Sequence, residues 1–399
     1  MTKEFLPVIL GTDWNVYGVA SSFNKAYGIK SVALGMRRQM YTNDLDYLDV
    51  HVFEDFDTSK VFVKELKNFA QQHKDKKLLL ISCSDYYTGL ITENKDKLND
   101  LYLMNYIDLD LRNSLENKKD FYEICEKYGL SYPKTFVISK SNKDNFTLPF
   151  EFPVICKPND SFKWLKVKFE GYKKAYKVDN LDQLNRILDL AYSNGYDDYM
   201  IIQDFIPGGS DAMFVVNAYV DSKGRVTMTH AAQTALDECL PNDIGNYNAL
   251  ISGDYHELVK EVKDFLEKIE YRGYANFDFK YDSRDGVYKV FEINLRQGRS
   301  SLYMTYAGNN FITYLVDDMV YGKEVNYYNH VDEHIWYLTA KSVLKKYCPD
   351  SLKDKVKRLL KEGKSNFGLD YAHRSNIKRW LLSLRRKLST IKYYPKYMR

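Results

Sequence analysis

Cysteine is scarce in this sequence, and its spacing excludes two kinds of site. The 399-residue chain has five cysteines, and no two of them stand in CxxC spacing. An odd number without close pairs argues against a disulfide framework and against a cysteine-rich zinc site. We expect these residues to be small buried hydrophobic side chains in a reducing compartment.

Long apolar runs and a strong charge of one sign are also missing. No stretch approaches the ~18 apolar residues of a membrane span, and the N-terminal apolar stretch is too short for a signal peptide. We therefore expect a cytoplasmic protein. Lys and Arg total 58 against 54 Asp and Glu, and this net charge of +4 gives no reason to expect a nucleic-acid partner. The composition, 45% hydrophobic and 28% charged, is that of a globular chain of two or three domains.

The first part of the chain alternates short apolar runs with helical patterns. Short apolar runs typical of strands occur at residues 6–10, 30–34 and 77–83. Spacing typical of helices occurs at residues 16–27 and 65–73. This alternation predicts βαβ units and a parallel sheet in a domain of about residues 1–112. Ligands bind at the carboxyl ends of such strands, so Asp13, Asn15 and Asp85 are candidates for a polar substrate site. The alternative is ordinary turn chemistry.

Two lysines stand where they can meet phosphate groups. Residues 113–129 show helical spacing, with Asn117 as the N-cap and Gly129 as the stop. Lys118 opposes the helix dipole unless an anion binds there; otherwise it is a solvated lysine with a small penalty. Lys157 ends the apolar segment PVICK, where it either extends its amine to solvent or points into a site.

Residues 275–296, ANFDFKYDSRDGVYKVFEINLR, predict a hairpin about the turn RDG. A three-residue loop with a left-handed glycine pairs Asp278 with Glu292 and Asn276 with Asn294 on one polar face. Opposed carboxylates repel unless a cation lies between them, and Mg²⁺ takes oxygen ligands. We favour a metal site over an accidental pair on a solvated face. A two- or four-residue loop would put Asp278 and Glu292 on opposite faces.

The segment after the hairpin, the other face of the hairpin and the helix before it give further predictions. Arg296 and Arg299, in RQGRSS, suit the binding of carboxylate, phosphate or an acyl-phosphate. The other face of the hairpin is expected to anchor it on a core, through Phe277, Phe279, Phe291, Ile293 and Leu295. Residues 254–269 predict a helix that begins with a capping box, Asp254-x-x-Glu257.

Taken in chain order, these motifs resemble the ATP-grasp ligases over residues 113–320. The opening LGTDWNVYG together with FPVICKP, QDFIPG and INLRQGRSS extends the likeness over most of the chain, to the ligases that add D-aspartate to a cell-wall precursor. The resemblance implies a mixed α/β and α+β ATP-grasp fold with a Rossmann-like N-terminal domain and a basic helical extension. It implies four segments: residues 1–112, two ATP-grasp subdomains at 113–205 and 206–330, the second with the metal site, and the extension at 331–399.

The resemblance also implies an activity and roles for residues. The enzyme would use ATP and Mg²⁺, two ions in most relatives, to join D-aspartate to the lysine amine of a UDP-MurNAc-pentapeptide through an acyl-phosphate. The implied nucleotide-binding residues are Lys118, Lys157, Gln203, Asp204, Phe205, Ile206 and Asp211. The implied metal ligands are Asp278, Glu292 and Asn294. Arg296 would stabilise the transferring phosphoryl group, and Arg299 with Ser300 or Ser301 would hold the amino-acid carboxylate near Asp13 and Asn15.

The sequence departs from the ATP-grasp pattern at two places. Two rival functions are also open. The loop at residues 159–171 is rich in lysine and aromatics where relatives have glycine, and Gln203 stands where the hinge usually has Glu. One rival is the same fold with another amino acid and acceptor. The other is a non-catalytic nucleotide-binding protein held at a membrane surface.

The C-terminal residues 374–399 contain nine basic residues and no acidic ones, interleaved with leucines. Such a basic amphipathic helix either lies on an anionic membrane surface, at the inner face of the membrane, or packs on the body with a solvated basic face. The residues leave both alternatives open.

Overall fold

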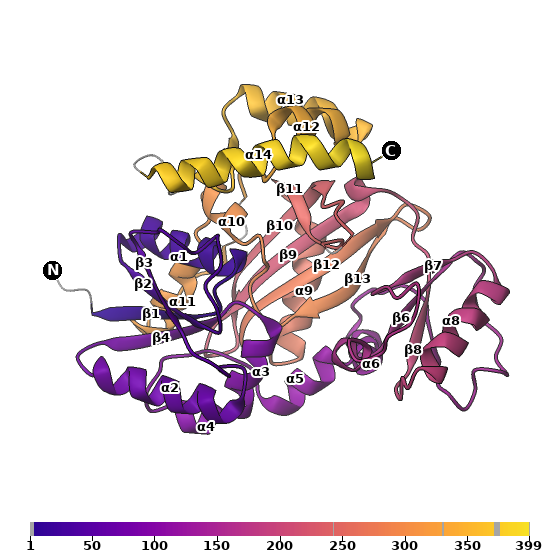
Figure 1. The fold of residues 1–399 in the computed structure, drawn as a ribbon, viewed down its shortest axis with the longest axis horizontal. Helices are drawn as coiled ribbons and strands as arrows, with labels where there is room; N and C mark the ends of the chain where they lie inside the picture. The colour runs from indigo at the N-terminus through magenta and orange to yellow at the C-terminus, as the bar shows by residue number, and fades with distance from the viewer. Residues whose placement is uncertain (1–3, 242, 329–330, 371–375, 399) are drawn as a thin grey trace. The chain divides into compact units, whose positions relative to one another are not determined.

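The computed structural model describes residues 4–241, 243–328, 331–370 and 376–398 (Figure 1). The chain divides into two compact units. The first contains Met1–Leu109, Gly209–Phe277 and Asn294–Arg399, and the second contains Asp110–Gly208 and Asp278–Ile293. The division into four consecutive segments stays a prediction.

The first unit begins with a four-stranded parallel sheet in the order β3-β2-β1-β4. Its elements are β1 (Phe5–Leu10), α1 (Trp14–Tyr27), β2 (Ser31–Gly35), β3 (Leu48–Val52), α2 (Ser59–Gln72), β4 (Lys77–Ser82), α3 (Asp85–Glu93) and α4 (Lys95–Leu98). The predicted βαβ pattern is confirmed, although α2 begins earlier than its apolar spacing indicated. Gly28 ends α1 in the left-handed conformation that favours glycine.

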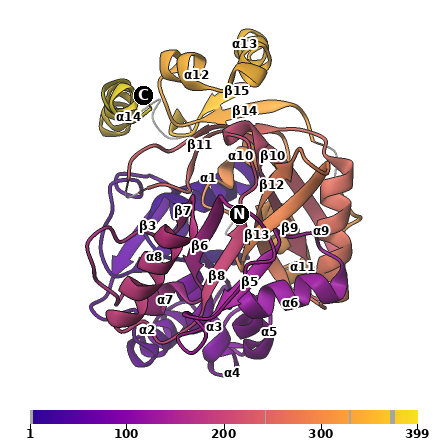
Figure 2. The ribbon, with the colours of Figure 1, turned by 90° about the vertical axis from the view of Figure 1, so that its right-hand side faces the viewer.

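A seven-stranded sheet follows in the order β13-β12-β9-β10-β11-β14-β15. Its strands are β9 (Met213–Val220), β10 (Val226–Asp237), β11 (Tyr247–Ser252), β12 (Gly273–Asp282), β13 (Val287–Asn294), β14 (His334–Tyr337) and β15 (Ser365–Phe367). Figure 2 shows α9 (His256–Lys268) beside the long strands. The ring of Phe265 on α9 meets that of Phe277 edge-on at 6.1 Å. The predicted capping box of α9 is wrong, because Asp254 pairs with His256 at 2.7 Å and the N-cap Tyr255 makes no side-chain cap bond.

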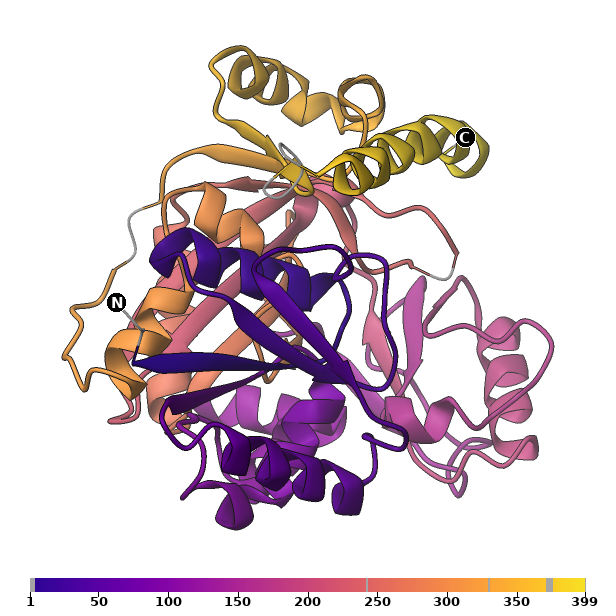
Figure 3. The same ribbon diagram turned by 60° about the vertical axis from the view of Figure 1, so that its left-hand side comes forward.

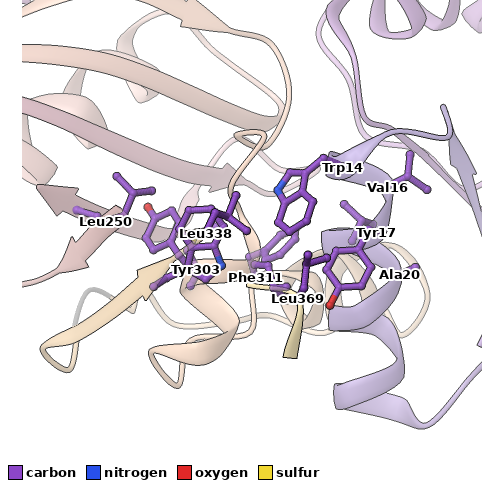
Figure 4. Close-up of a cluster of buried hydrophobic side chains, with 14 of the residues drawn as sticks. Trp14, Val16, Tyr17, Ala20, Leu250, Tyr303, Phe311, Leu338 and Leu369 are labelled. Carbon is purple, nitrogen blue, oxygen red and sulfur yellow. The ribbon is translucent and has the colours of Figure 1, made fainter. Parts of the chain in front are cut away.

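A large hydrophobic cluster lies in the first unit (Figure 4). Trp14 and Tyr17 of α1 pack with Tyr303, Phe311 and residues of the large sheet. The remaining helices of this unit are α10 (Leu302–Tyr306), α11 (Ile312–Met319), α12 (Lys341–Tyr347), α13 (Lys353–Lys361) and α14 (Ile377–Tyr397). Figure 3 shows α12, α13 and α14 as a layer next to β14 and β15. The predicted C-terminal helix is therefore confirmed.

The second unit contains an antiparallel sheet in the order β5-β8-β6-β7. Its elements include α5 (Leu109–Glu116), α6 (Lys118–Tyr128), β5 (Thr135–Ile138), β6 (Val154–Pro158), α7 (Ser161–Trp164), β7 (Tyr176–Val178), α8 (Leu181–Ser193) and β8 (Met200–Asp204). The caps of α6 are those predicted: the Asn117 side chain accepts from the Asp120 N–H, and Gly129 is left-handed.

The connection between β12 and β13 differs from the predicted loop. Residues 283–286 join the strands, one more than expected, and the Gly286 N–H donates to the Asp282 carbonyl at 2.8 Å. Near this turn Lys289 meets Asp282 at 2.8 Å, whereas at the base Asn294 donates to the Asn276 side chain at 3.2 Å. The partners Asp282 and Asn276 lie six positions apart in β12, whereas Lys289 and Asn294 lie five positions apart in β13, so the spacing of these side-chain contacts along the two strands is not regular.

Candidate active site

A half-buried lysine forms the centre of a cluster in the second unit. The Lys157 ammonium at the end of β6 donates to the Tyr122 hydroxyl at 2.9 Å and lies 5.8 Å from the centre of the Phe291 ring. The Tyr122 hydroxyl in turn donates to the Phe291 carbonyl at 2.6 Å. Burial and the charge of Lys118 lower the pKa of Lys157 to about 7, against the opposing effect of Glu292. A cation desolvated in this way gains most from a polyanionic ligand.

The second predicted lysine is tied to the loop that follows β6. The Lys118 ammonium donates to the Asn159 carbonyl at 3.3 Å and to the Ser161 hydroxyl at 3.1 Å. The fully buried Asn159 side chain accepts from the Lys119 N–H at 2.9 Å in the first turn of α6. The structure therefore brings Lys118 and Lys157 into one cluster at the N-terminus of a helix, where anions bind well.

The predicted adenine hinge follows β8 in the same unit. Sheet pairing of β8 ends at Asp204, so the backbone groups of Phe205 and Ile206 lie beyond the ladder. The Gln203 side chain is buried and donates to Thr135 at 2.8 Å, which leaves the hinge role to backbone groups. Asp204 instead receives two hydrogen bonds from Arg284, at 3.2 and 2.7 Å.

Two lysines flank the face of the hinge aromatic residue. The ammonium groups of Lys177 and Lys280 lie 4.8 and 5.3 Å from the centre of the Phe205 ring. Sequence reasoning missed both lysines: Lys177 stands in no motif, and Lys280 lies within the predicted hairpin but was assigned no role.

The predicted metal ligands lie on the β12–β13 ribbon. Glu292 is exposed and its charge acts on Lys157, while Asp278 is half-buried. No three His, Cys, Asp or Glu side chains of the described residues gather as a metal-binding group, and the predicted set has only two carboxylates beside Asn294. Phe291 was expected on the core face, but its ring lies by Lys157. The pairing of Asp278 with Glu292 stays a prediction.

The first unit contains a second cluster, centred on Arg296. Its guanidinium donates to the Asp85 carboxylate at 2.9 Å, to the side-chain oxygen of Asn294 at 3.2 Å, and to the Gln297 backbone carbonyl at 3.1 Å. Its Nε is buried and has no hydrogen-bond partner among the described residues. An arginine with an unused buried donor is suited to an additional anionic ligand.

Asp13 belongs to the same cluster. Burial raises the pKa of Asp13, while the Val16 N–H and the charges of Arg299 and Arg296 oppose this shift. Its carboxylate caps α1 by accepting from the Asn15 and Val16 N–H groups at 3.1 and 3.3 Å. Asn15 donates to the Cys83 carbonyl at 2.9 Å, and its side-chain oxygen is buried without a partner among the described residues.

The loop after β13 is fixed by residues that sequence reasoning missed. The Gln297 amide donates to the Ser82 carbonyl at the end of β4 at 2.9 Å, and the Gly298 N–H donates to Asn217 at 2.7 Å. A Cβ on Gly298 would lie 2.9 Å from the Asn276 amide nitrogen. These contacts hold the predicted substrate-binding loop in one conformation beside the parallel sheet.

A small cavity of the first unit adjoins this loop. Its lining includes the predicted residues Arg299 and Ser300, and otherwise consists of Trp14, Tyr41, Glu238, Asp243, Tyr247, Asn248, Leu338 and Arg386. Arg386, from α14, donates to Glu238 at 3.0 Å and to Asn248 at 2.9 Å. Ser301 is fully buried.

The predicted ribose ligand, Asp211, also lies in the first unit. Its carboxylate accepts from the Ser351 hydroxyl at 2.5 Å, and its backbone carbonyl accepts from Gln233 at 2.7 Å.

Comparison with known proteins decides the family. No family model matches the chain. The sequence is 41% identical over 394 residues to a protein named D-aspartate ligase from Enterococcus faecium (strain Aus0004), covering 95% of this chain and 93% of that one. The chain belongs to the D-aspartate ligase family. It is thus an enzyme of the carboxylate–amine ligase class, as the resemblance implied.

Solved structures with low sequence identity share its fold. N5-carboxyaminoimidazole synthetase from Staphylococcus aureus complexed with ADP has a TM-score of 0.61 at 14% identity, covering 90% of this chain and 87% of that one. L-amino acid ligase from Bacillus licheniformis has a TM-score of 0.57 at 14% identity, covering 80% and 75%. These are ATP-grasp proteins, so the predicted fold class is confirmed, and ATP with Mg²⁺ is what this fold uses.

In the part of the chain that the structure describes, no helix combines the length and apolar character needed to cross a bilayer.

Proposed function

We propose that this member of the D-aspartate ligase family joins the β-carboxylate of D-aspartate to the lysine ε-amine of a UDP-MurNAc-pentapeptide. The carboxylate oxygen attacks the γ-phosphorus of ATP, ADP leaves, and an acyl-phosphate forms. The amine then attacks the acyl carbon, loses a proton, and phosphate leaves. The observation that carries the proposal is the named relative at 41% identity, because it covers both clusters described above.

The cluster of the second unit supports nucleotide binding. Lys157 and Lys118 place two ammonium groups where nucleotide phosphates would compensate the desolvation of Lys157. The backbone of Phe205 and Ile206, free of sheet pairing, offers the groups that would hold adenine. Because the Asp204 side chain is committed to Arg284, its role in the hinge would be limited to its backbone.

The ribbon supports binding of Mg²⁺ through the chemistry of its donors. Asp278, Glu292 and Asn294 offer hard oxygen atoms of the type that Mg²⁺ takes, and a set of two carboxylates and an amide suits an ion that keeps water and phosphate ligands. When bound, Mg²⁺ neutralises phosphate charge during phosphoryl transfer.

The cluster of the first unit supports binding of the amino-acid donor. Arg299 and Ser300 line the cavity, and Asp13 carries a charge opposite to that of an amino group. Arg296, with its unpaired buried Nε, would stabilise the phosphoryl group in flight. The two guanidinium groups of Arg296 and Arg299 are suited to a donor that carries two carboxylates.

ADP release with a panel of D- and L-amino acids, with and without UDP-MurNAc-pentapeptide, tests the proposal. We expect ADP and the amide product only with D-aspartate and the pentapeptide together. Amide product with another amino acid and acceptor would change the proposed substrates but leave the proposed reaction unchanged. No ADP with any pair would leave a nucleotide-binding protein and overturn the proposal.

A further inference from the structure

The C-terminal helix α14 carries its polar residues inward. Its buried side chains include Arg379, Ser383, Thr390, Tyr393 and Tyr394. Arg379 donates to the Tyr41 carbonyl at 2.9 Å, and the Tyr393 hydroxyl donates to Glu238 at 3.0 Å. This inner face is fixed by specific hydrogen bonds, so α14 is firmly attached to the first unit.

The opposite face of α14 is apolar and exposed. It consists of Ile377, Trp380, Leu381, Leu384, Leu388 and Ile391, with exposures between 37% and 74%. These positions follow a spacing of three, four and seven residues, which places them on one stripe of a helix with 3.6 residues per turn. A stripe of this length on the outside of a folded unit marks an interaction surface.

Cations border this stripe. Arg385, Lys392 and Lys396 are exposed along one side of it, and residues 376–399 contain no acidic residue. Carboxylates of the first unit pair with other cations of α14, Asp44 with Lys378 at 2.9 Å and Asp370 with Lys387 at 3.9 Å. The neighbouring helix α12 adds exposed lysines at 341, 345 and 346 and packs on α14 through Tyr347 and Tyr394, whose rings lie 5.6 Å apart (Figure 2).

We propose that the outer face of α14 docks the enzyme onto an anionic lipid bilayer, lying flat at the headgroup level. An apolar stripe bordered by cations complements such a surface. A second copy of the chain fits less well, because pairing two such helices would bring cations against cations with no acidic residue to compensate them. With no helix suited to crossing a bilayer among the described residues, the contact is peripheral.

Trp380 gives a direct optical signal for this contact. The sequence has four tryptophans, and Trp380 is 48% exposed whereas Trp14, Trp164 and Trp336 are buried. We expect its fluorescence to shift to the blue when the full-length protein is mixed with vesicles containing phosphatidylglycerol. Phosphatidylcholine vesicles should leave the emission unchanged, and Trp380→Phe should remove the shift.

Two sets of variants separate the apolar and the electrostatic contributions. Arg385→Gln/Lys392→Gln/Lys396→Gln should lower the partition coefficient onto phosphatidylglycerol vesicles about a hundred-fold, since each cation near an anionic surface contributes about five-fold. Leu384→Ser/Leu388→Ser should lower it to a similar extent, at about ten-fold for each leucine withdrawn from lipid. The control Lys60→Gln/Lys64→Gln/Lys67→Gln removes the same charge from exposed positions of α2 and should change it little.

ADP release in vesicle-free solution should be unchanged in all three sets of variants. Equal binding to both kinds of vesicle, or an equal loss in the α2 control, would overturn the anionic-surface proposal. Absence of vesicle binding together with a concentration-dependent dimer that Leu384→Ser/Leu388→Ser abolishes would assign the face to a second copy instead. Specific capture of an acidic protein without vesicle binding would also overturn it.

Discussion

The ion pair of Arg386 with Glu238 anchors α14, and its removal gives a prediction whose pH dependence has a definite sign. The Glu238 side chain is 5% exposed and accepts from Arg386 at 3.0 Å. It also accepts from the Tyr393 hydroxyl at 3.0 Å and from the Cys239 N–H at 2.9 Å. Arg386→Met therefore leaves a buried carboxylate that keeps part of its hydrogen bonding but has lost its cation.

Breaking a buried pair by removing one partner costs about 3–5 kcal/mol, and the remaining donors place this case near 3 kcal/mol in the free energy of unfolding at pH 7. Burial alone would raise the pKa of Glu238, and Arg386 holds it below the usual value. The native pair therefore contributes stability that is present above pH 4.5 and lost as the pH falls through the depressed pKa of the folded state.

In Arg386→Met the sign reverses, because burial then dominates and raises the pKa of Glu238. The folded variant binds a proton more tightly than the unfolded chain, so its penalty shrinks as the pH falls from 7 toward 4. Urea unfolding followed by circular dichroism at several pH values measures this difference. The double variant Glu238→Gln/Arg386→Met should recover most of the loss, and the exposed Arg385→Met should change the free energy of unfolding by less than about 0.5 kcal/mol. A pH-independent loss in Arg386→Met would refute the reasoning.

The other predictions concern turnover and ligand binding. Glu292→Gln should abolish turnover with the fold intact, because a metal-ligand charge is lost; near-normal ADP release would count against that role. The pKa of Lys157 is about 7, so about nine-tenths of the Lys157 side chains are neutral at pH 8 in the free protein. ATP binding at pH 8 should therefore take up close to one proton. Calorimetry in two buffers measures this uptake, which Lys157→Met should remove and which Lys143→Met, at a surface ion pair, should retain. Gly298→Ala, whose Cβ would press on the Asn276 amide, should raise KM for the amino acid more than it changes the melting temperature.

Local signals explain most of what the sequence predicted correctly. The caps of α6 follow from Asn117 and Gly129, because each acts on backbone groups within a few residues. The capping box at Asp254 fails for an equally local reason, since a neighbouring histidine competes for the carboxylate. The loop between β12 and β13 is longer than expected because the Asp282 carboxylate binds Arg284 and Lys289 and so stabilises a wider turn.

Non-local contacts set the limit of what the sequence could predict about the site. Lys118 and Lys157 were identified individually, but the aromatic enclosure that lowers the pKa of Lys157 depends on Tyr122 and Phe291, which come from different segments. The cavity beside Arg299 depends in the same way on Glu238 and Arg386, which stand 148 residues apart in the chain and form no recognisable motif.

The C-terminal helix shows why a periodic pattern does not by itself tell which face is buried. The leucines of α14 predict a helix with one apolar face, and such a face is ordinarily turned to the core. Here the inner positions are taken by Arg379, Arg386 and Tyr393, whose hydrogen bonds to backbone carbonyls, to Asn248 and to Glu238 satisfy buried polar groups that leucines could not. Turning the leucines inward would leave Glu238 buried without its cation, so the polar network holds the apolar stripe on the outside.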